Sequence, residues 1–356
     1  MKIGLISPLW KKLPPEKYGG TELVVYDLAC ALTEKGHEVT VFASGDSNLP
    51  CKLVPIVERN LYDILGKFKW DFYDYDILQT EIVGKMSNDF DILHNHNGFI
   101  PLSITPLVKT PVVTTIHSSL PPEPAVLREA FKDRFYVSIS NAQRELAPEL
   151  NWIATVYHGI DVKKYPFSDK KGEYLLFLGT FSPYKGPDIA IEISKKSGIP
   201  IILAGEIRKE FEDFYKEKIL SEQDGKQIKV FGELTFSEKA ELLKNALALI
   251  LPVRWKEAFG LVMIEAMACG TPVIAPRRAS VPEIVIDGVT GFIVSVENMI
   301  DGMVKKIEEI KNINPLNCRL HVEKNFTAEK MVKEYLKVYE KILQIHKPFS
   351  LLEKIW

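Results

Sequence analysis

The chain has 356 residues, which is enough for two domains of ordinary size. Its hydrophobic content of 46%, charged content of 26% and formal net charge of −2 are typical of globular proteins and indicate no nucleic-acid partner. No segment approaches the ~20 apolar residues of a membrane-spanning helix, and the N-terminal apolar run is too short for a signal peptide. The four scattered cysteines form no C-x-x-C pair, so we expect reduced thiols, a cytoplasmic location and no metal.

The first half of the chain alternates short apolar strands with helices. Strands are predicted at 2–7, 38–43, 91–94, 111–116 and 137–140. Between the first two of them, Thr21 can cap a helix over 22–35, and Gly36 occupies the position that favours its end. This alternation is typical of a parallel sheet covered by helices.

A second cycle of the same kind begins at Tyr174. Its strands are predicted at 174–178, 199–204, 229–232, 248–251 and 272–275. Pro187 lies where a helix would start, Ser237 can cap a helix over 238–245, and a last helix is predicted from about residue 328 to 343. The sequence therefore predicts an α/β protein with two doubly wound parallel sheets, joined by the segment 165–172.

Two carboxylates in the run 254–275 carry the clearest functional signal. Glu257 and Glu265 are separated by seven residues around an apolar helical stretch. Eight helical residues rise about 12 Å, comparable to the span from the ribose to the hexose of a nucleotide sugar. A surface glutamate followed by an amphipathic helix would also produce this spacing. The surrounding Phe259-Gly260-Leu261 and the residues 268–272 favour a ligand site.

This run resembles the C-terminal signature of retaining glycosyltransferases of family 4, whose GT-B fold has two Rossmann-like domains facing a central cleft. Further motifs follow in the order that the family uses, at 15–20, 115–117, 158–161, 177–186 and 281–283. The resemblance covers roughly residues 1–340. It implies an acceptor-binding domain at 1–165 and a nucleotide-sugar-binding domain at 170–335. It also implies that a C-terminal helix, about 340–356, packs back on the first domain.

The resemblance assigns the donor to the second domain. Glu257 would bind sugar hydroxyls, and Glu265 would hold both ribose hydroxyls. Phe259, Gly260 and Leu261 would offer backbone amides at a helix N-terminus. Lys185, which precedes the first helix of this domain, would neutralise the leaving diphosphate.

One position departs from the family pattern. The family pairs the lysine with an arginine just after the strand glycine, and here Thr180 stands in its place. Two possibilities remain open: the leaving group is stabilised more weakly, or the missing arginine is replaced by Arg254, Arg277 or Arg278. It is also the reason to consider a catalytically impaired protein.

The candidate residues of the first domain come directly after predicted strands, where doubly wound folds bind ligands. Gly19 and Gly20 precede a helix and would let the backbone approach a diphosphate or an acceptor, although a flexible loop would have the same composition. The resemblance places His117 beside the sugar ring as a catalytic residue. Contact with the acceptor or sugar is predicted for His94, His96 and Tyr18, whereas the role of His158, where relatives often have Asn, is open.

These observations predict a retaining glycosyltransferase that moves a hexose from a nucleotide sugar to an acceptor hydroxyl. Glucose from UDP-glucose is the first choice, and the acceptor is a small molecule, a glycan or a lipid carrier. No cofactor besides the nucleotide sugar is expected. The alternatives are a nucleotide-sugar-binding protein without turnover and a GT-B sugar-nucleotide epimerase.

Overall fold

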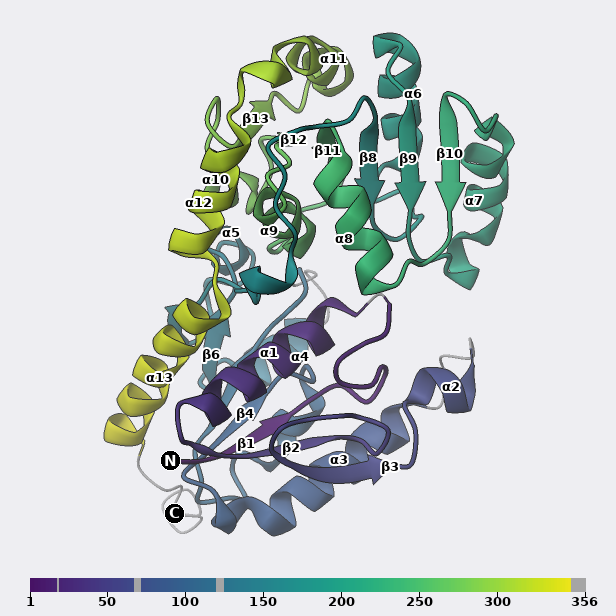
Figure 1. The fold of residues 1–356 in the computed structure, drawn as a ribbon. Coiled ribbons are helices and arrows are strands. Elements are labelled where there is room, and N and C mark those ends of the chain that lie inside the picture. Colours follow the sequence, from purple (N-terminus) through teal and green to yellow (C-terminus); the bar gives the residue numbers. More distant parts are fainter. Residues whose placement is uncertain (18, 67–71, 120–124, 347–356) are drawn as a thin grey trace. The chain divides into compact units, whose positions relative to one another are not determined.

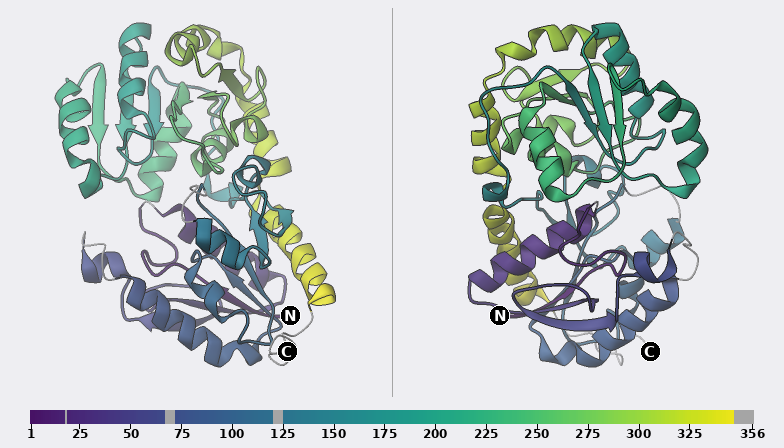
Figure 2. Two further views of the ribbon diagram at one scale, coloured as in Figure 1. Left: turned by 180° about the vertical axis from the view of Figure 1, so that it is seen from behind. Right: turned by 45° about the vertical axis from the view of Figure 1, so that its right-hand side comes forward.

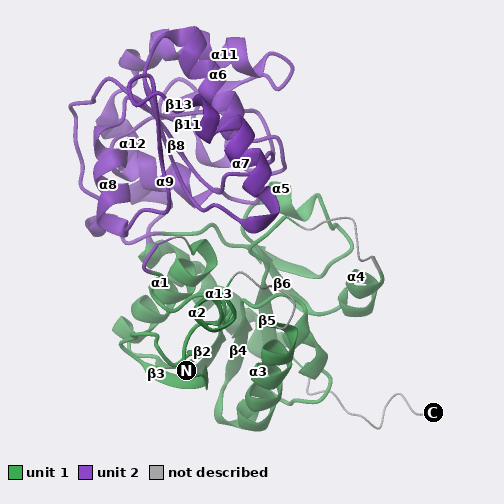
Figure 3. Ribbon diagram, turned by 90° about the vertical axis from the view of Figure 1, so that its right-hand side faces the viewer, with its two compact units in different colours: residues 1–15, 19–159, 328–356 green, residues 16–18, 160–327 purple. Residues whose placement is uncertain are grey.

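The computed structural model describes residues 1–17, 19–66, 72–119 and 125–346, and it shows parallel sheets with helices on both faces (Figures 1 and 2). The chain divides into two compact units (Figure 3). Unit 1 comprises Met1–Pro15, Gly19–Gly159 and the chain from Ala328 onward. Unit 2 comprises Ile160–Thr327 with Glu16 and Lys17.

Unit 1 is built on a seven-stranded parallel sheet with the order β3-β2-β1-β4-β5-β6-β7. Its strands are β1 (Lys2–Ile6), β2 (Glu38–Ser44), β3 (Lys52–Val57), β4 (Ile92–Asn95), β5 (Val112–Thr115), β6 (Phe135–Ser138) and β7 (Trp152–Thr155). The central strands are short apolar runs because both of their faces are covered, and β4 and β5 are buried along their whole length.

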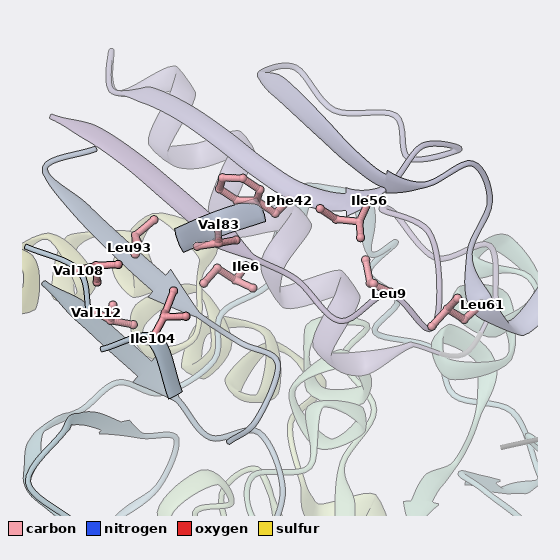
Figure 4. Close-up of a cluster of buried hydrophobic side chains, with 10 residues drawn as sticks. All are labelled: Ile6, Leu9, Phe42, Ile56, Leu61, Val83, Leu93, Ile104, Val108 and Val112. Carbon is pink, nitrogen blue, oxygen red and sulfur yellow. The ribbon is translucent and has the colours of Figure 1, made fainter. Parts of the chain in front are cut away.

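The helices of unit 1 cover the two faces of this sheet. They are α1 (Gly20–Glu34), α2 (Leu61–Leu65), α3 (Phe72–Met86), α4 (Ala125–Phe131), α5 (Asn141–Arg144) and α13 (Ala328–Ile345). On one face, Val83 of α3 packs among Ile6, Phe42 and Leu93 of the sheet (Figure 4). Side chains alternate along a strand, so Leu5 and His94 point to the opposite face.

Helix α13 occupies that opposite face. Its buried residues recur at helical spacing, among them Val332, Tyr335 and Tyr339. The Tyr339 hydroxyl lies 2.7 Å from His94 Nδ1, and the Tyr335 hydroxyl lies 3.0 Å from Thr115 Oγ1. The last part of the chain therefore completes unit 1. Of the predicted returning helix at about 340–356, residues 347–356 lie outside the described residues.

Unit 2 has a six-stranded parallel sheet with the order β10-β9-β8-β11-β12-β13. Its strands are β8 (Leu175–Leu178), β9 (Ile201–Ala204), β10 (Ile228–Phe231), β11 (Ala248–Ile250), β12 (Val273–Pro276) and β13 (Gly291–Val294). Its helices are α6 (Pro187–Ser197), α7 (Glu212–Lys218), α8 (Phe236–Asn245), α9 (Leu261–Ala268), α10 (Val281–Ile284), α11 (Met299–Glu309) and α12 (Pro315–Asn325). Helix α9 packs against both α8 and α12, while α6 packs against α11.

The helix ends partly follow the sequence predictions. Gly36, directly after the C-cap of α1, has a φ of 81°, and Pro187 is the first residue of α6, so both predictions are confirmed. Two predicted caps are wrong. Helix α1 starts one residue earlier than Thr21 and has Gly19 as its N-cap. Helix α8 is capped by Thr235, not Ser237, because Thr235 forms a reciprocal capping box with Glu238.

The segment 165–172 is bonded to the body of unit 2. The backbone amides of Ser168 and Gly172 donate to the carbonyls of Cys269 and Asn245. Lys171 Nζ donates to Thr271 Oγ1 at 3.1 Å and to the carbonyls of Lys244 and Cys269 at 3.0 Å each. This cation therefore meets the C-terminal ends of α8 and α9, where the helix dipoles favour positive charge.

Candidate functional site

The predicted Lys185 and Glu257 meet at the carboxyl edge of the unit 2 sheet. Lys185 follows β8 and precedes α6, and its Nζ lies 2.5 Å from Glu257 Oε2. The two side chains are 20% and 9% exposed, so the pair is largely shielded from water yet reachable. Gly186, the N-cap of α6, has a φ of 74°, and a Cβ there would lie 2.3 Å from the Pro252 carbonyl oxygen. Only glycine lets the chain turn so tightly into α6 beside the lysine.

Trp255 contacts both members of this pair, and it was not predicted from the sequence. Its Nε1–H donates to Glu257 Oε2 at 3.0 Å, the same oxygen that accepts from Lys185. Lys185 Nζ also lies 4.5 Å from the centroid of the indole ring, which is a cation–π contact. The carboxylate therefore keeps one fixed donor if Lys185 turns to a ligand.

The loop from Glu257 to Leu261 leads into the N-terminus of α9. Gly260 is the N-cap with a φ of 85°, and Leu261 is the first residue of the helix. Phe259 is buried, and its carbonyl accepts from the hydroxyl of Ser280 at 2.9 Å. The Ser280 amide donates to the Glu257 carbonyl at 3.3 Å. Ser280 thus fixes this loop, and its sequence signal was its position next to the motif at 281–283.

Glu265 lies on the body of α9 with a different set of partners. Its side chain is 5% exposed. Its Oε1 accepts from the Tyr165 hydroxyl at 2.9 Å and from Lys239 Nζ at 2.6 Å. Tyr165 and Lys239 are far away in the sequence, and nothing in their local pattern indicated this contact.

Thr180 is buried, and its carbonyl accepts from the Ser182 amide at 2.8 Å. Among the arginines considered as substitutes, Arg254 is bound by both of its terminal nitrogens to Asp188, at 2.7 and 2.6 Å. Arg278 donates to the Arg254 carbonyl. The guanidinium of Arg254 is therefore committed to an ion pair.

Arg208 is linked to the turn at Thr180 by the buried Glu206. Glu206 accepts from Arg208 Nε at 2.6 Å, and its backbone carbonyl accepts from the Phe181 amide at 2.9 Å. Arg208, which follows β9 by four residues, was not among the predicted site residues.

In unit 1, the predicted histidines come together. His96 Nδ1 lies 2.8 Å from His117 Nε2, and the ring centroids of His94 and His96 are 3.9 Å apart. The His117 ring stacks on that of His158, with centroids 5.1 Å apart. Burial lowers the pKa of His117 to about 3 and holds the pKa values of His94, His96 and His158 well below the ordinary value. The four rings are therefore neutral at pH 7.

His94 differs from the other predicted residues because both of its ring nitrogens are used. Nδ1 lies 2.7 Å from the Tyr339 hydroxyl and Nε2 lies 2.8 Å from Thr115 Oγ1. It is fully buried within β4. Its ring is therefore held within unit 1, and its predicted contact with acceptor or sugar stays a prediction.

The loop that carries His117 is held by Gln143, which the sequence analysis missed. Gln143 Nε2 donates to the carbonyls of Ile116 and Ser118, at 2.9 and 2.8 Å, one on each side of His117. Gln143 is itself fixed by a bond from its amide to Ser140 Oγ. The S-x-x-Q spacing of Ser140 and Gln143 is a capping-box pattern that could have revealed this contact.

Gly19 and Gly20 lie at the start of α1, where Gly19 is the N-cap. A Cβ on Gly19 would lie 2.8 Å from the Cβ of Pro15, so the chain passes closely over the proline. The predicted Tyr18 lies outside the described residues.

No helix in the described part of the chain is long and apolar enough to cross a membrane. Apart from the gaps at 18, 67–71, 120–124 and 347–356, no group of three or more His, Cys, Asp or Glu side chains is arranged to hold a metal ion. The buried histidines therefore do not form such a group.

Unit 2 is a doubly wound sheet with the Lys185–Glu257 pair beside the N-termini of α6 and α9, an arrangement that can bind the phosphates of a nucleotide. Two family models match consecutive parts of the chain: Glycosyltransferase Family 4 at residues 18–164 and Glycosyl transferases group 1 at residues 161–325. The chain belongs to glycosyltransferase family 4, and it transfers a sugar from a nucleotide sugar. The predicted family, enzyme class and GT-B fold are confirmed.

Relatives match over nearly the whole chain. An uncharacterized glycosyltransferase of Methanocaldococcus jannaschii is 28% identical over 94% of this chain and 99% of its own length. The N-acetyl-alpha-D-glucosaminyl L-malate synthase of Bacillus anthracis is 26% identical over 92% of this chain and 95% of its own length. The crystal structure of Anabaena HepE in complex with UDP and glucose has a TM-score of 0.75 at 18% identity, over 96% of this chain and 99% of that one.

Proposed function

We propose that the protein is a retaining hexosyltransferase that uses UDP-glucose and passes the glucosyl group to an acceptor hydroxyl. The observation that carries the proposal is the Lys185–Glu257 pair at the entrance of α6 and α9. A lysine and two helix N-termini favour a diphosphate, and a largely buried carboxylate suits sugar hydroxyls. The proposal takes UDP-glucose as the first donor because the similar HepE structure contains UDP and glucose.

In this proposal different residues of unit 2 bind different parts of the nucleotide sugar. Glu265, on the body of α9, binds the ribose hydroxyls, and the amides of Phe259, Gly260 and Leu261 face the donor from the helix start. Lys185 leaves Glu257 to neutralise the diphosphate as the bond to the sugar breaks. Glu257 then binds the sugar while Trp255 keeps its carboxylate oriented. Gly19 and Gly20, at the start of α1, offer backbone amides to the diphosphate.

In unit 1, the proposal assigns His117 to the sugar ring and its neighbour His96 to the acceptor. Retention means that the acceptor hydroxyl attacks from the face that the diphosphate leaves. The reaction is placed in the cytoplasm, which agrees with the absence of a disulfide among the four cysteines in the described residues.

Calorimetry with UDP, GDP, ADP and their hexose conjugates tests the donor assignment. The wild type should bind the UDP forms selectively. Glu265→Gln should weaken binding at least tenfold, since the amide cannot accept two ribose hydroxyl bonds as a carboxylate does. This variant retains an acceptor for Tyr165, and thermal unfolding would verify that it folds. The matched control is Glu217→Gln, an exposed carboxylate on α7. Equal binding by wild type and Glu265→Gln would contradict the donor assignment.

A second candidate, a binding protein without turnover, is favoured by the uncharged Thr180. Release of UDP in the presence of an acceptor panel separates the two functions. Binding of UDP-glucose without release under any condition would favour the second candidate. Conversion of the bound sugar without release of UDP would indicate an epimerase.

A further inference from the structure

The buried face of α3 is polar toward the start of the helix. Its buried residues Asp76, Gln79, Thr80 and Val83 recur at helical spacing, and only Val83 among these four is apolar. Three apolar residues of the same turns are exposed instead: Tyr73, Ile77 and Leu78. The hydrophobic effect would favour the reverse arrangement. The polar residues at this end of α3 therefore have a reason other than packing.

Gln79 fixes this end of α3 on the sheet of unit 1. Its Nε2 donates to the carbonyl of Ser7, which follows β1, at 2.8 Å and to the carbonyl of Phe42 in β2 at 3.2 Å. Carbonyls can only accept, so Gln79 Oε1 is the atom that faces Asn97 Nδ2, at 2.9 Å. Asp76, one turn before Gln79, therefore lies at the carboxyl edge, where doubly wound sheets bind ligands.

Asn97, in the loop after β4, links Gln79 to Asp76. Its Nδ2 donates to Gln79 Oε1 and, at 2.8 Å, to Asp76 Oδ1. Both N–H groups of this amide are thus used, so the side chain cannot turn over without losing both bonds. Two acceptor atoms are left over, Asp76 Oδ2 and Asn97 Oδ1. Neither accepts a hydrogen bond from another residue that the structure describes.

Asp76 is a buried carboxylate without a cation among the described residues. It is 6% exposed, and its side-chain partner there is the uncharged amide of Asn97. Lys85, the basic residue of α3, is bound to Glu81 at 2.6 Å. Burial raises the pKa of the Asp76 carboxyl to about 6, so the group is still largely ionised at pH 7.

The buried carboxylates of unit 2 have a different environment. Each of the three is paired with a cation, at 2.6, 2.5 and 2.6 Å: Glu206 with Arg208, Glu257 with Lys185 and Glu265 with Lys239. A buried carboxylate is costly without such a partner, because the charge loses its hydration. Asp76 therefore has the properties of a group whose cation comes with a ligand.

From this arrangement we infer that Asp76 and Asn97 form a binding site for a primary ammonium group of the acceptor. An ammonium offers three N–H donors and a positive charge, which match two oxygen acceptors and one negative charge. A hydroxyl could donate only one bond and would leave the charge of Asp76 unpaired, and a phosphate or carboxylate would be repelled. The inference rests on the proposed function in that the ligand is the acceptor, which becomes a hydroxyl compound that carries an amine.

Carbon NMR of protein labelled at the aspartate carboxyl carbons tests the site in the wild type. The resonance of Asp76 is identified by its absence from Asp76→Asn. The probes are glucosamine, which carries an ammonium group at pH 7, and N-acetylglucosamine, in which the same nitrogen belongs to an uncharged amide. Glucosamine should shift the Asp76 resonance and lower the pKa of this carboxyl, because a cation favours the charged form. N-acetylglucosamine should leave both unchanged.

Variants separate the charge of Asp76 from its position. Asp76→Asn keeps a carbonyl oxygen for Asn97 but replaces Oδ2 with a donor, so it should weaken the binding of glucosamine roughly tenfold or more by calorimetry. The matched control is Asp74→Asn, which removes an exposed carboxylate of the same helix and should leave the binding unchanged. Thermal unfolding would verify that both variants fold, and the titration of the wild type stands without them.

The outcomes are distinct from those of the donor experiment. Nucleotide-sugar binding without any effect of glucosamine on Asp76 would overturn this inference and leave the proposed function standing. Equal shifts with both probes would overturn the ammonium chemistry, and equal affinity of wild type and Asp76→Asn for glucosamine would overturn the site. A glucosamine effect that Asp76→Asn abolishes, in a protein that binds no nucleotide sugar, would support this site and contradict the proposed function.

Discussion

At the residue scale, the charged groups of unit 2 are held by partners from distant parts of the chain. Lys185 and Glu257 lie in recognisable motifs, and the structure brings them within 2.5 Å. Their partners come from elsewhere: Glu265 is bound by Tyr165, 100 residues away, and by Lys239, 26 residues away. Such contacts depend on how the segment 165–172, α8 and α9 pack, which no local pattern encodes.

Trp255 provides a test at this scale. Trp255→Phe keeps the aromatic ring under Lys185 but removes the Nε1–H that orients Glu257. A hydrogen bond to a charged group contributes about 1.5–3 kcal/mol, so we expect roughly tenfold weaker binding of the nucleotide sugar by calorimetry. Free UDP should be affected less, since the proposal assigns Glu257 to the sugar.

The control for Trp255→Phe is Trp152→Phe, which removes an indole bond to the Ala147 carbonyl in unit 1. It should leave binding of the nucleotide sugar unchanged. If Trp255→Phe lost affinity for UDP and UDP-glucose equally, the substitution would act through Lys185 and the diphosphate, not through Glu257 and the sugar.

At the scale of elements, strands and long helices were predictable because their apolar residues recur at regular spacing. The predicted helix at about 328–343 corresponds to α13 (Ala328–Ile345). The strands β3, β7 and β13 were not predicted. In β7 all four residues are only partly buried, so the sequence has no continuous apolar run there that would predict a strand. Helix caps depend on side-chain geometry at one residue, and the N-cap of α8 lies two residues before the predicted Ser237.

The cap of α8 yields a prediction of its own. Thr235→Ala removes the side chain that accepts from the Glu238 amide and should lower the free energy of unfolding of unit 2 by about 1 kcal/mol. Ser237→Ala, which alters the residue that the sequence favoured, should change it by less than about 0.5 kcal/mol. Urea unfolding followed by hydrogen exchange in peptides of β8 and β9, which report on unit 2, would compare the two variants. A larger effect of Ser237→Ala would restore the original assignment.

At the scale of the whole molecule, the two-sheet architecture followed from alternating patterns and family motifs, but the distribution of buried ionisable groups did not. The sequence shows seven histidines without indicating that His94, His96, His117 and His158 are gathered in unit 1. His94 lies on β4, His96 and His117 follow β4 and β5, and His158 lies in the loop after β7. A consequence for the stability of unit 1 follows from their burial.

Unit 1 should be sensitive to mild acid. Burial lowers the pKa of the four histidines below the ordinary 6.5, so below pH 6.5 the unfolded chain takes up protons that the folded unit cannot. The stability that is present above pH 6.5 is then lost as the pH falls. Burial has the opposite effect on Asp76, because it raises the pKa of this carboxyl to about 6. Between pH 6 and 3.8 the folded state therefore binds a proton at Asp76 that the unfolded state does not, which favours folding as the pH falls. In that window Asp76 opposes part of the loss of stability that the four histidines cause.

Hydrogen exchange at pH 7, 6 and 5, corrected for the intrinsic rate, would follow the two units separately through peptides of β4 and β5 and of β8 and β9. We expect protection in β4 and β5 to fall steeply while β8 and β9 stay protected. Asp76→Asn removes this opposing effect and should make the fall steeper, whereas His158→Asn removes one of the buried imidazoles and should make it shallower. An equal loss of protection in the two units, unchanged by either variant, would show that the folded state does not exclude protons from these histidines.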